Sequence, residues 1–197
     1  MDYRKLAVTV MTATLLCGRS MVVMAEEPTV QIATALGNIV VAVDITHAPV
    51  SAANFLRYVA ARSYDGGMFH RTVTMDNQPN NAVKIEVIQA GAAAAHGEFA
   101  PIALERTTVT GLKHLAGVIS MARDGPNTAT SDFFICVTDQ PSLDFGGARN
   151  SDGQGFAAFG RVVSGMQVVR RIQQSKAHGQ ILTPPVQISS IRWVPHP

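Results

Sequence analysis

Short apolar runs recur along most of the chain, and turn-forming residues separate them. From residue 29 onward the runs are rich in valine, isoleucine and phenylalanine, with glycine, asparagine or aspartate between them. This pattern is typical of a β-barrel or a β-sandwich. Residues 30–34 and 38–44 flank Leu36-Gly37 and predict a β-hairpin. Further strands are predicted at residues 69–73, 84–89, 117–122, 133–138, 157–163 and 186–194.

Two segments have helical periodicity. Pro49 stands where a helix can begin, and apolar residues follow it at spacings of three, namely Val50, Ala53, Leu56 and Val59. The same spacing recurs within residues 165–175, at Met166, Val169 and Ile172. A strand-rich chain with one helix near each end is the pattern of a barrel closed by helices.

The first 25 residues have the pattern of a secretory signal peptide. Arg4 and Lys5 provide a basic start, residues 6–16 form an uncharged apolar run, and Ala25 is a small residue at the expected cleavage point. The apolar run has about 11 residues, which is short of the ~20 needed to span a bilayer as a helix. We therefore expect cleavage after Ala25, a mature domain at residues 26–197 without a membrane span, and a periplasmic or secreted location.

The composition and net charge of the chain bear on which kinds of molecule it could bind. The chain has 197 residues, of which 47% are hydrophobic and 15% charged, as in an ordinary globular protein of one domain. The sixteen basic and fourteen acidic residues fall to thirteen of each without the leader, which holds three basic residues and one acidic residue. A neutral mature domain gives no support for binding to nucleic acid or to an anionic membrane. We expect a monomer.

Disulfide, metal and cofactor chemistry find little support in the sequence. Cys136 is the one cysteine left after cleavage, so the mature domain has no partner for an intrachain disulfide, and its apolar neighbours predict a buried thiol. The six histidines lie far apart, without the paired spacing of metal ligands. The glycines of residues 146–155 lack the lysine and the strand-to-helix setting of a phosphate-binding loop. No metal and no cofactor are expected.

Four segments carry a much more specific signal. They are YDGGMFHR at residues 64–71, IQAG at 88–91, GVISMARDGPNTATSDFFIC at 117–136 and FAAFGRVVSGM at 156–166. In their residues and in their order along the chain, these segments closely resemble the cyclophilins. The resemblance extends from about Thr29 to Val194. It implies a mainly β fold, a closed eight-stranded antiparallel barrel capped by two α-helices. It also implies peptidyl-prolyl cis-trans isomerase activity on X-Pro segments of unfolded or partly folded proteins.

The chemistry of proline isomerisation explains why an arginine is needed. Rotation about an X-Pro bond must break amide resonance against a barrier of ~20 kcal/mol. The twisted prolyl nitrogen gains a lone pair, so a fixed donor aimed at it stabilises the twisted state. The resemblance assigns this catalytic role to Arg71, and to Gln89 the task of holding the arginine and the substrate carbonyl. Outside this motif, Arg71 would be interpreted as a strand arginine in a salt bridge and Gln89 as a solvated residue.

The resemblance also implies a shallow apolar pocket for the proline ring. Its predicted lining is Val87, Phe134, Leu143 and Phe156. A purely structural core position fits Val87 and Leu143 equally well. Ala122 and Arg123 match the pair that binds the substrate backbone through main-chain groups, so the side chain of Arg123 is expected to matter little for that contact. Asp132 stands where the family has a substrate-binding glutamine.

Several positions depart from the family pattern. Residues 74–83 look like an exposed insertion of about ten residues beside the site. Glu86 stands where the family has a pocket phenylalanine, and Ser142 where it has a tryptophan. We therefore expect a pocket with less apolar area and more negative charge, and a working but weakened or specialised isomerase. Glu86 and Asp132 could pair with Arg71 and reduce its reach toward the prolyl nitrogen. They could instead orient Arg71 and favour basic substrates, and the sequence is compatible with both effects.

Two other functions are also compatible with the sequence. One is a proline-peptide binding module or holdase that keeps the fold with little catalysis, since a fold does not fix a function. It would bind proline-containing peptides without changing their exchange rate. The other is an interaction domain whose partner docks on residues 74–83 or on residues 146–155, although such loops are more often solvated turns.

Overall fold

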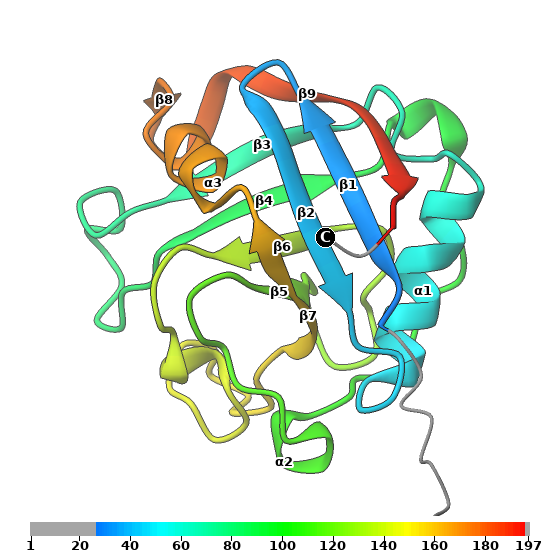
Figure 1. The fold of residues 1–197 in the computed structure, drawn as a ribbon. Helices are drawn as coiled ribbons and strands as arrows, with labels where there is room; N and C mark the ends of the chain where they lie inside the picture. Colours follow the sequence, from blue (N-terminus) through cyan, green and yellow to red (C-terminus); the bar gives the residue numbers. More distant parts are fainter. Residues whose placement is uncertain (1–26, 196–197) are drawn as a thin grey trace, which may run out of the picture.

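The fold is an antiparallel barrel that closes on itself. The computed structural model describes residues 27–195. Its strands are β1 Thr29–Thr34, β2 Gly37–Val43, β3 Met68–Val73, β4 Val87–Gly91, β5 Val118–Met121, β6 Phe133–Cys136, β7 Ala157–Ser164, β8 Ala177–His178 and β9 Ile181–Trp193. The order is β1-β2-β7-β5-β6-β4-β3-β9-β8, and β9 also pairs with β1 (Figure 1). The predicted closed eight-stranded barrel is confirmed, with the two-residue β8 in addition.

Two longer helices lie against the barrel where the periodicity predicts them. These are α1, Pro49–Ala60, and α3, Met166–Gln173 (Figure 1). Pro49 occupies the first turn of α1, and both carboxylate oxygens of Glu105 accept hydrogen bonds from backbone N–H groups of that turn, at 3.0 and 2.7 Å. A carboxylate from a distant loop thus caps α1 and complements its dipole. A third, four-residue helix, α2 at Thr107–Thr110, was not predicted from periodicity.

The barrel interior is filled by side chains. Aromatic rings pack edge to face or tilted around Phe55 of α1, with Phe133 at 5.5 Å and Phe159 at 5.2 Å between ring centroids. Tyr64 joins the same group, and all four side chains are almost completely buried. Since the interior holds this packed core, a ligand has to bind on the outside of the barrel.

Strand alternation creates a second, smaller apolar cluster on the outer face. In β6, Phe133 and Ile135 belong to the interior core, whereas Phe134 and Cys136 face the other way. Val87 of β4 joins them there, and the complete cluster is Val73, Ile85, Val87, Phe134, Cys136 and Leu143. Cys136 is buried, as its apolar neighbours predict, and burial raises the pKa of its thiol well above the usual range.

Two strand boundaries differ from the prediction. The strand expected at 84–89 begins at Val87, because the side chain of Gln78 hydrogen-bonds both backbone groups of Ile85 in place of a neighbouring strand. The last strand begins at Ile181, earlier than the expected residue 186. The predicted leader, residues 1–25, lies outside the described residues. No helix within the described part of the chain is long and apolar enough to cross a membrane.

Candidate active site

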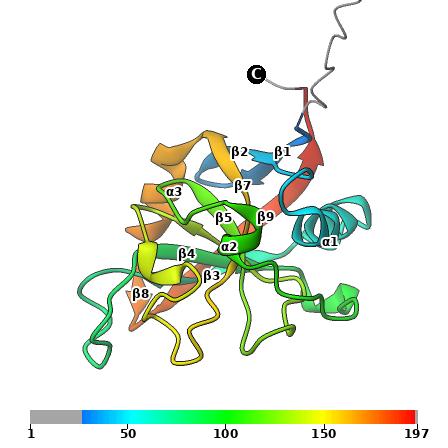
Figure 2. The same ribbon diagram turned by 90° about the horizontal axis from the view of Figure 1, so that it is seen from below.

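A pocket of about 510 Å³ opens on the outer face of β4 and β6. Loops that follow β3, β5 and the 3-10 turn η2 (Pro141–Leu143) project from this side of the barrel (Figure 2). The structure brings all nine predicted site residues together in the pocket lining, namely Arg71, Val87, Gln89, Ala122, Arg123, Asp132, Phe134, Leu143 and Phe156. Residues up to 85 positions apart in the sequence therefore meet at one place because the barrel pairs their strands.

Two glutamines fix the guanidinium of Arg71. Nη1 donates to Oε1 of Gln89 at 2.9 Å, across the β3–β4 pair in which the two residues are register partners. Nε and Nη2 both donate to Oε1 of Gln180, at 2.9 and 2.6 Å. Three of the five N–H donors are thus used, and one on Nη1 and one on Nη2 are left for a substrate.

Asp132 determines which way the amide of Gln89 points. Its Oδ2 accepts a hydrogen bond from Nε2 of Gln89 at 2.9 Å, and Nε2 of His70 lies 3.5 Å from the same oxygen. A carboxylate accepts only from the amide nitrogen, so the amide oxygen of Gln89 has to face Arg71. Gly91 permits this approach, because a Cβ there would collide with the Asp132 carboxylate.

The apolar part of the pocket is a small set of side chains with a rigid backing. Phe134 is 4% exposed and meets the ring of Phe156 edge to face, with 5.3 Å between centroids. Behind Phe134 the imidazole of His114 stacks at 5.9 Å and is held by Oδ1 of Asp144 at 2.8 Å. Burial would raise the pKa of Asp144, but its hydrogen bonds from His114 outweigh this and lower it below its usual value.

Main-chain groups at the edge of the pocket are available to a peptide. The N–H of Ala122 donates to the carbonyl of Asp132 at 2.9 Å and is therefore occupied. The N–H and the carbonyl of Arg123 have no hydrogen-bond partner within residues 27–195. Unpaired main-chain groups beside a pocket suit an extended peptide, which carries one donor and one acceptor at every residue but proline.

Comparison with known proteins agrees with this geometry. Residues 29–193 match the family described as cyclophilin type peptidyl-prolyl cis-trans isomerase/CLD. The chain belongs to the cyclophilin family. This cyclophilin is 38% identical to peptidyl-prolyl cis-trans isomerase A of Dickeya dadantii over 146 residues, which cover 74% of this chain and 70% of that protein. It is 36% identical to a peptidyl-prolyl cis-trans isomerase of Acinetobacter baylyi, with 83% and 84% covered.

Solved structures show the same fold. A crystal structure of a Cryptosporidium parvum cyclophilin type peptidyl-prolyl cis-trans isomerase matches with a TM-score of 0.70 at 21% identity, over 87% of this chain and 99% of that one. A crystal structure of the same protein in the presence of the dipeptide Ala-Pro matches with a TM-score of 0.67 at 20% identity, over 85% and 99%. At this identity the likeness concerns the fold.

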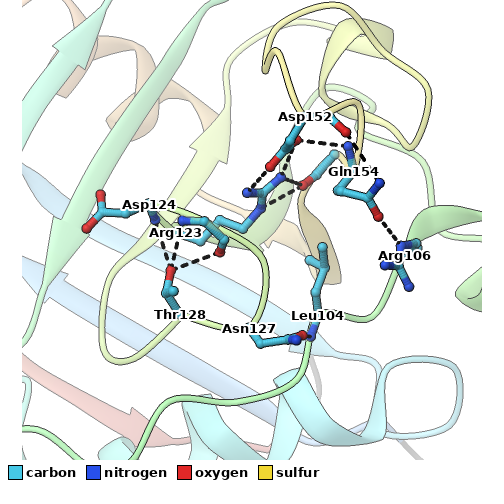
Figure 3. Close-up of polar contacts among 10 residues, drawn as sticks. Leu104, Arg106, Arg123, Asp124, Asn127, Thr128, Asp152 and Gln154 are labelled. Carbon is cyan, nitrogen blue, oxygen red and sulfur yellow. Dashed lines mark hydrogen bonds and ion pairs between the residues drawn. The ribbon is translucent and has the colours of Figure 1, made fainter.

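The side chain of Arg123 does more than the sequence suggested. It is 1% exposed and lies beneath the loop that precedes Phe156 (Figure 3). Its Nη1 and Nη2 donate to the two carboxylate oxygens of Asp152, at 2.7 and 3.0 Å, and its Nε and Nη2 donate to the carbonyl of Gly155. Its charge also lies 5.1 Å from the ring centre of Phe156. Arg123 therefore holds Phe156 in the pocket wall.

The expectation that Glu86 adds charge to the pocket is wrong. Glu86 is absent from the pocket lining and binds elsewhere, to the hydroxyl of Thr138 at 2.9 Å and to the amide of Gln173 at 3.4 Å. Ile85, 6% exposed, lines the pocket in its stead. The shift by one residue follows from Gln78, which binds the backbone of Ile85 and sets which neighbour faces the site.

Neither acidic residue pairs with Arg71. Asp132 binds Gln89, and no ion pair of Arg71 occurs among the described residues. Of the two effects left open by the sequence, orientation is the one that the geometry favours, and it acts through Gln89.

Seven residues of the pocket lining were missed from the sequence, Ile85 and Arg149 among them, and so was Gln180, which binds Arg71 from outside the lining. Gln180 and Ile85 have ordinary local surroundings, and only the β3–β9 pairing and the Gln78 contacts place them. Arg149 lies in a loop for which the four motifs give no guide. The described residues contain no cluster of three or more histidine, cysteine, aspartate or glutamate side chains that could hold a metal ion.

Proposed function

We propose that this cyclophilin accelerates the isomerisation of X-Pro bonds in exported proteins as they fold, with Arg71 as the catalytic residue. The observation that carries the proposal is the pair of free N–H donors on a guanidinium fixed by Gln89 and Gln180, in a pocket that also contains the apolar side chains of Phe134 and Phe156. Such an arrangement needs neither a nucleophile nor a metal ion.

Arg71 would act by electrostatic stabilisation. Burial and the nearby charge of Arg149 lower the pKa of Arg71, but an arginine in a protein stays protonated. Its two free donors can meet the lone pair that forms on the prolyl nitrogen as the amide twists. Because the glutamines fix the donors beforehand, little reorganisation is needed when the bond rotates.

The remaining pocket residues would hold the substrate. Phe134, Leu143 and Phe156 offer apolar contact to the proline ring, and the main chain of Arg123 offers hydrogen bonds to the peptide. Burial of a proline ring against such side chains contributes on the order of 1–3 kcal/mol. Weak, unspecific binding of this size suits an enzyme that acts on many exposed X-Pro segments.

Refolding of a small protein limited by X-Pro isomerisation tests this function. Such a refolding phase takes about 10–100 s without catalyst. We expect the full chain to shorten it in proportion to its concentration. An unchanged slow phase, together with saturable binding of proline peptides in calorimetry, would instead support a binding module.

Export is a separate part of the proposal and rests on residues 1–25. Mass spectrometry of the protein from a bacterial periplasmic fraction should find Glu26 as its first residue. Recovery of the chain in the cytoplasm with Met1 intact would contradict export and leave the isomerase activity untouched.

A further inference from the structure

Arg149 is held at the pocket by residues 74–83, the loop that is inserted relative to the family pattern. Its Nη1 donates to Oε1 of Gln78 at 2.9 Å and to the carbonyl of Val83 at 2.7 Å. Gln78 is 1% exposed, and its own amide donates to the carbonyls of Thr74 and Ile85. The two loops at residues 74–83 and 146–155 therefore meet at Arg149 and give its guanidinium a defined position in the pocket lining.

The charge of Arg149 is not neutralised by the protein. Its partners are an amide oxygen and a backbone carbonyl, and no ion pair of Arg149 or Arg71 occurs among residues 27–195. Nε and Nη2 of Arg149 have no hydrogen-bond partner in the same residues. The third arginine of the pocket, Arg123, is neutralised by Asp152.

Acidic residues also line the pocket, and they lie at the end opposite to Arg149. In the β3–β4 ladder, Val73 pairs with Val87, Arg71 with Gln89, and Met68 with Gly91. Arg149 lies beyond the Val87 end, through its bond to the loop that leads into β4.

At the opposite, Gly91 end, Asp132 approaches Gly91 closely. Glu98 accepts hydrogen bonds from the hydroxyls of Thr130 and Ser131 next to it. Asp124 lies on the exposed loop after β5. The pocket is therefore basic at one end, with Arg71 between the basic end and the acidic end.

We propose that the free Nε and Nη2 of Arg149 form a subsite for a carboxylate, with the charge of Arg71 adding attraction while its donors face the prolyl nitrogen, so that this cyclophilin prefers X-Pro segments with an acidic residue next to the proline. An arginine with free donors binds a carboxylate through paired N–H groups, and its attraction is strongest where water is partly excluded. A preference for basic substrates, which the sequence left open as one consequence of Glu86 and Asp132, would be the opposite. The inference rests on the proposed isomerase function.

Peptide exchange spectroscopy with the full chain tests the subsite. Two series of five-residue peptides have a central proline, and glutamate, glutamine or lysine stands directly before the proline in one series and directly after it in the other. The quantity compared is the ratio of kcat/KM for the glutamate peptide to that for the glutamine peptide. At low ionic strength we expect a ratio of about three to ten in at least one series, falling toward one at high salt.

Three variants assign the preference to a residue. Arg149→Gln should bring the ratio close to one, and Arg149→Lys should keep at least half of the preference because it keeps the charge. Arg170→Gln is the matched control, since Arg170 is an exposed arginine of α3 outside the pocket. It removes the same charge and should leave both the ratio and the basal activity unchanged. Because each ratio is internal to one variant, a general loss of activity does not affect it.

The outcomes separate the two proposals. Acceleration of the glutamine peptides with a ratio below two in both series, or a preference for lysine, overturns the subsite and leaves the isomerase. A ratio that survives Arg149→Gln, or that is lost equally in Arg149→Lys, also overturns it. If no peptide is accelerated, the isomerase function fails and the subsite fails with it.

Discussion

Replacement of Gln180 by methionine removes the acceptor that holds one edge of the Arg71 guanidinium. Methionine has a similar length and no amide, so the change leaves Nε and Nη2 of Arg71 without their contacts at 2.9 and 2.6 Å. Gln89 alone would then hold the side chain, through a single bond to Nη1. Arg71 should keep its charge but lose its fixed direction.

The size of the effect follows from these two contacts. A hydrogen bond to a charged group contributes about 1.5–3 kcal/mol. If catalysis loses one such contribution because Arg71 must be reoriented in the twisted state, kcat/KM falls about ten- to hundredfold. The loss should appear mainly in kcat, because Gln180 is not among the residues that line the pocket.

Line-shape or magnetisation-transfer spectroscopy of an Ala-Pro peptide measures this loss. Gln187→Met is the matched control, since Gln187 is an exposed residue of β9 and its substitution should leave the rate unchanged. Gln180→Glu gives a second readout, because its carboxylate would pair with Arg71, lower the rate and restore part of it as the pH falls and the glutamate is protonated. A folded Gln180→Met variant within twofold of the wild-type rate would refute the view that Gln180 positions Arg71.

Three further predictions follow from individual contacts. Glu105→Ala removes the cap of α1 and should lower the free energy of unfolding by about 0.5–2 kcal/mol in urea titrations, and an unchanged midpoint would exclude a capping role. Because the pKa of Asp144 is lowered in the fold, its stabilising contribution is present above about pH 4 and is lost as the pH falls through its folded pKa. Urea titrations of the wild type and Asp144→Asn should therefore converge in acid, whereas a constant difference down to pH 3 would contradict this. Asp152→Ala frees Arg123 and should raise KM about two- to fivefold by loosening Phe156, with Asp76→Ala on an exposed loop as control.

The sequence predicts most of the barrel because its strands are short apolar runs with clear turns between them. Side chains alternate between the two faces of a strand, so Phe133 and Ile135 face the interior core and Phe134 faces the pocket. The start of β4 was missed because Gln78 replaces a strand partner there, and no local pattern reports a contact made by an inserted loop.

The candidate site divides in the same way. The motifs are enough to place residues such as Arg71, Gln89 and Phe134 at the site. Gln180 could not be placed in this way, because its contact with Arg71 spans 109 positions and depends on how β9 pairs with β3. The position of Glu86 relative to Gln89 in the sequence predicts that Glu86 faces the pocket. This is wrong, because the inserted loop places Ile85 there instead.

The most direct test of the central claim compares the wild type with Arg71→Ala in the exchange of a short Ala-Pro peptide. We expect clear acceleration by the wild type and the loss of nearly all of it in Arg71→Ala, while both proteins bind the peptide and unfold at similar temperatures. A wild-type rate no greater than that of Arg71→Ala would contradict the catalytic role of Arg71, because the fixed guanidinium would then contribute nothing to rotation of the X-Pro bond.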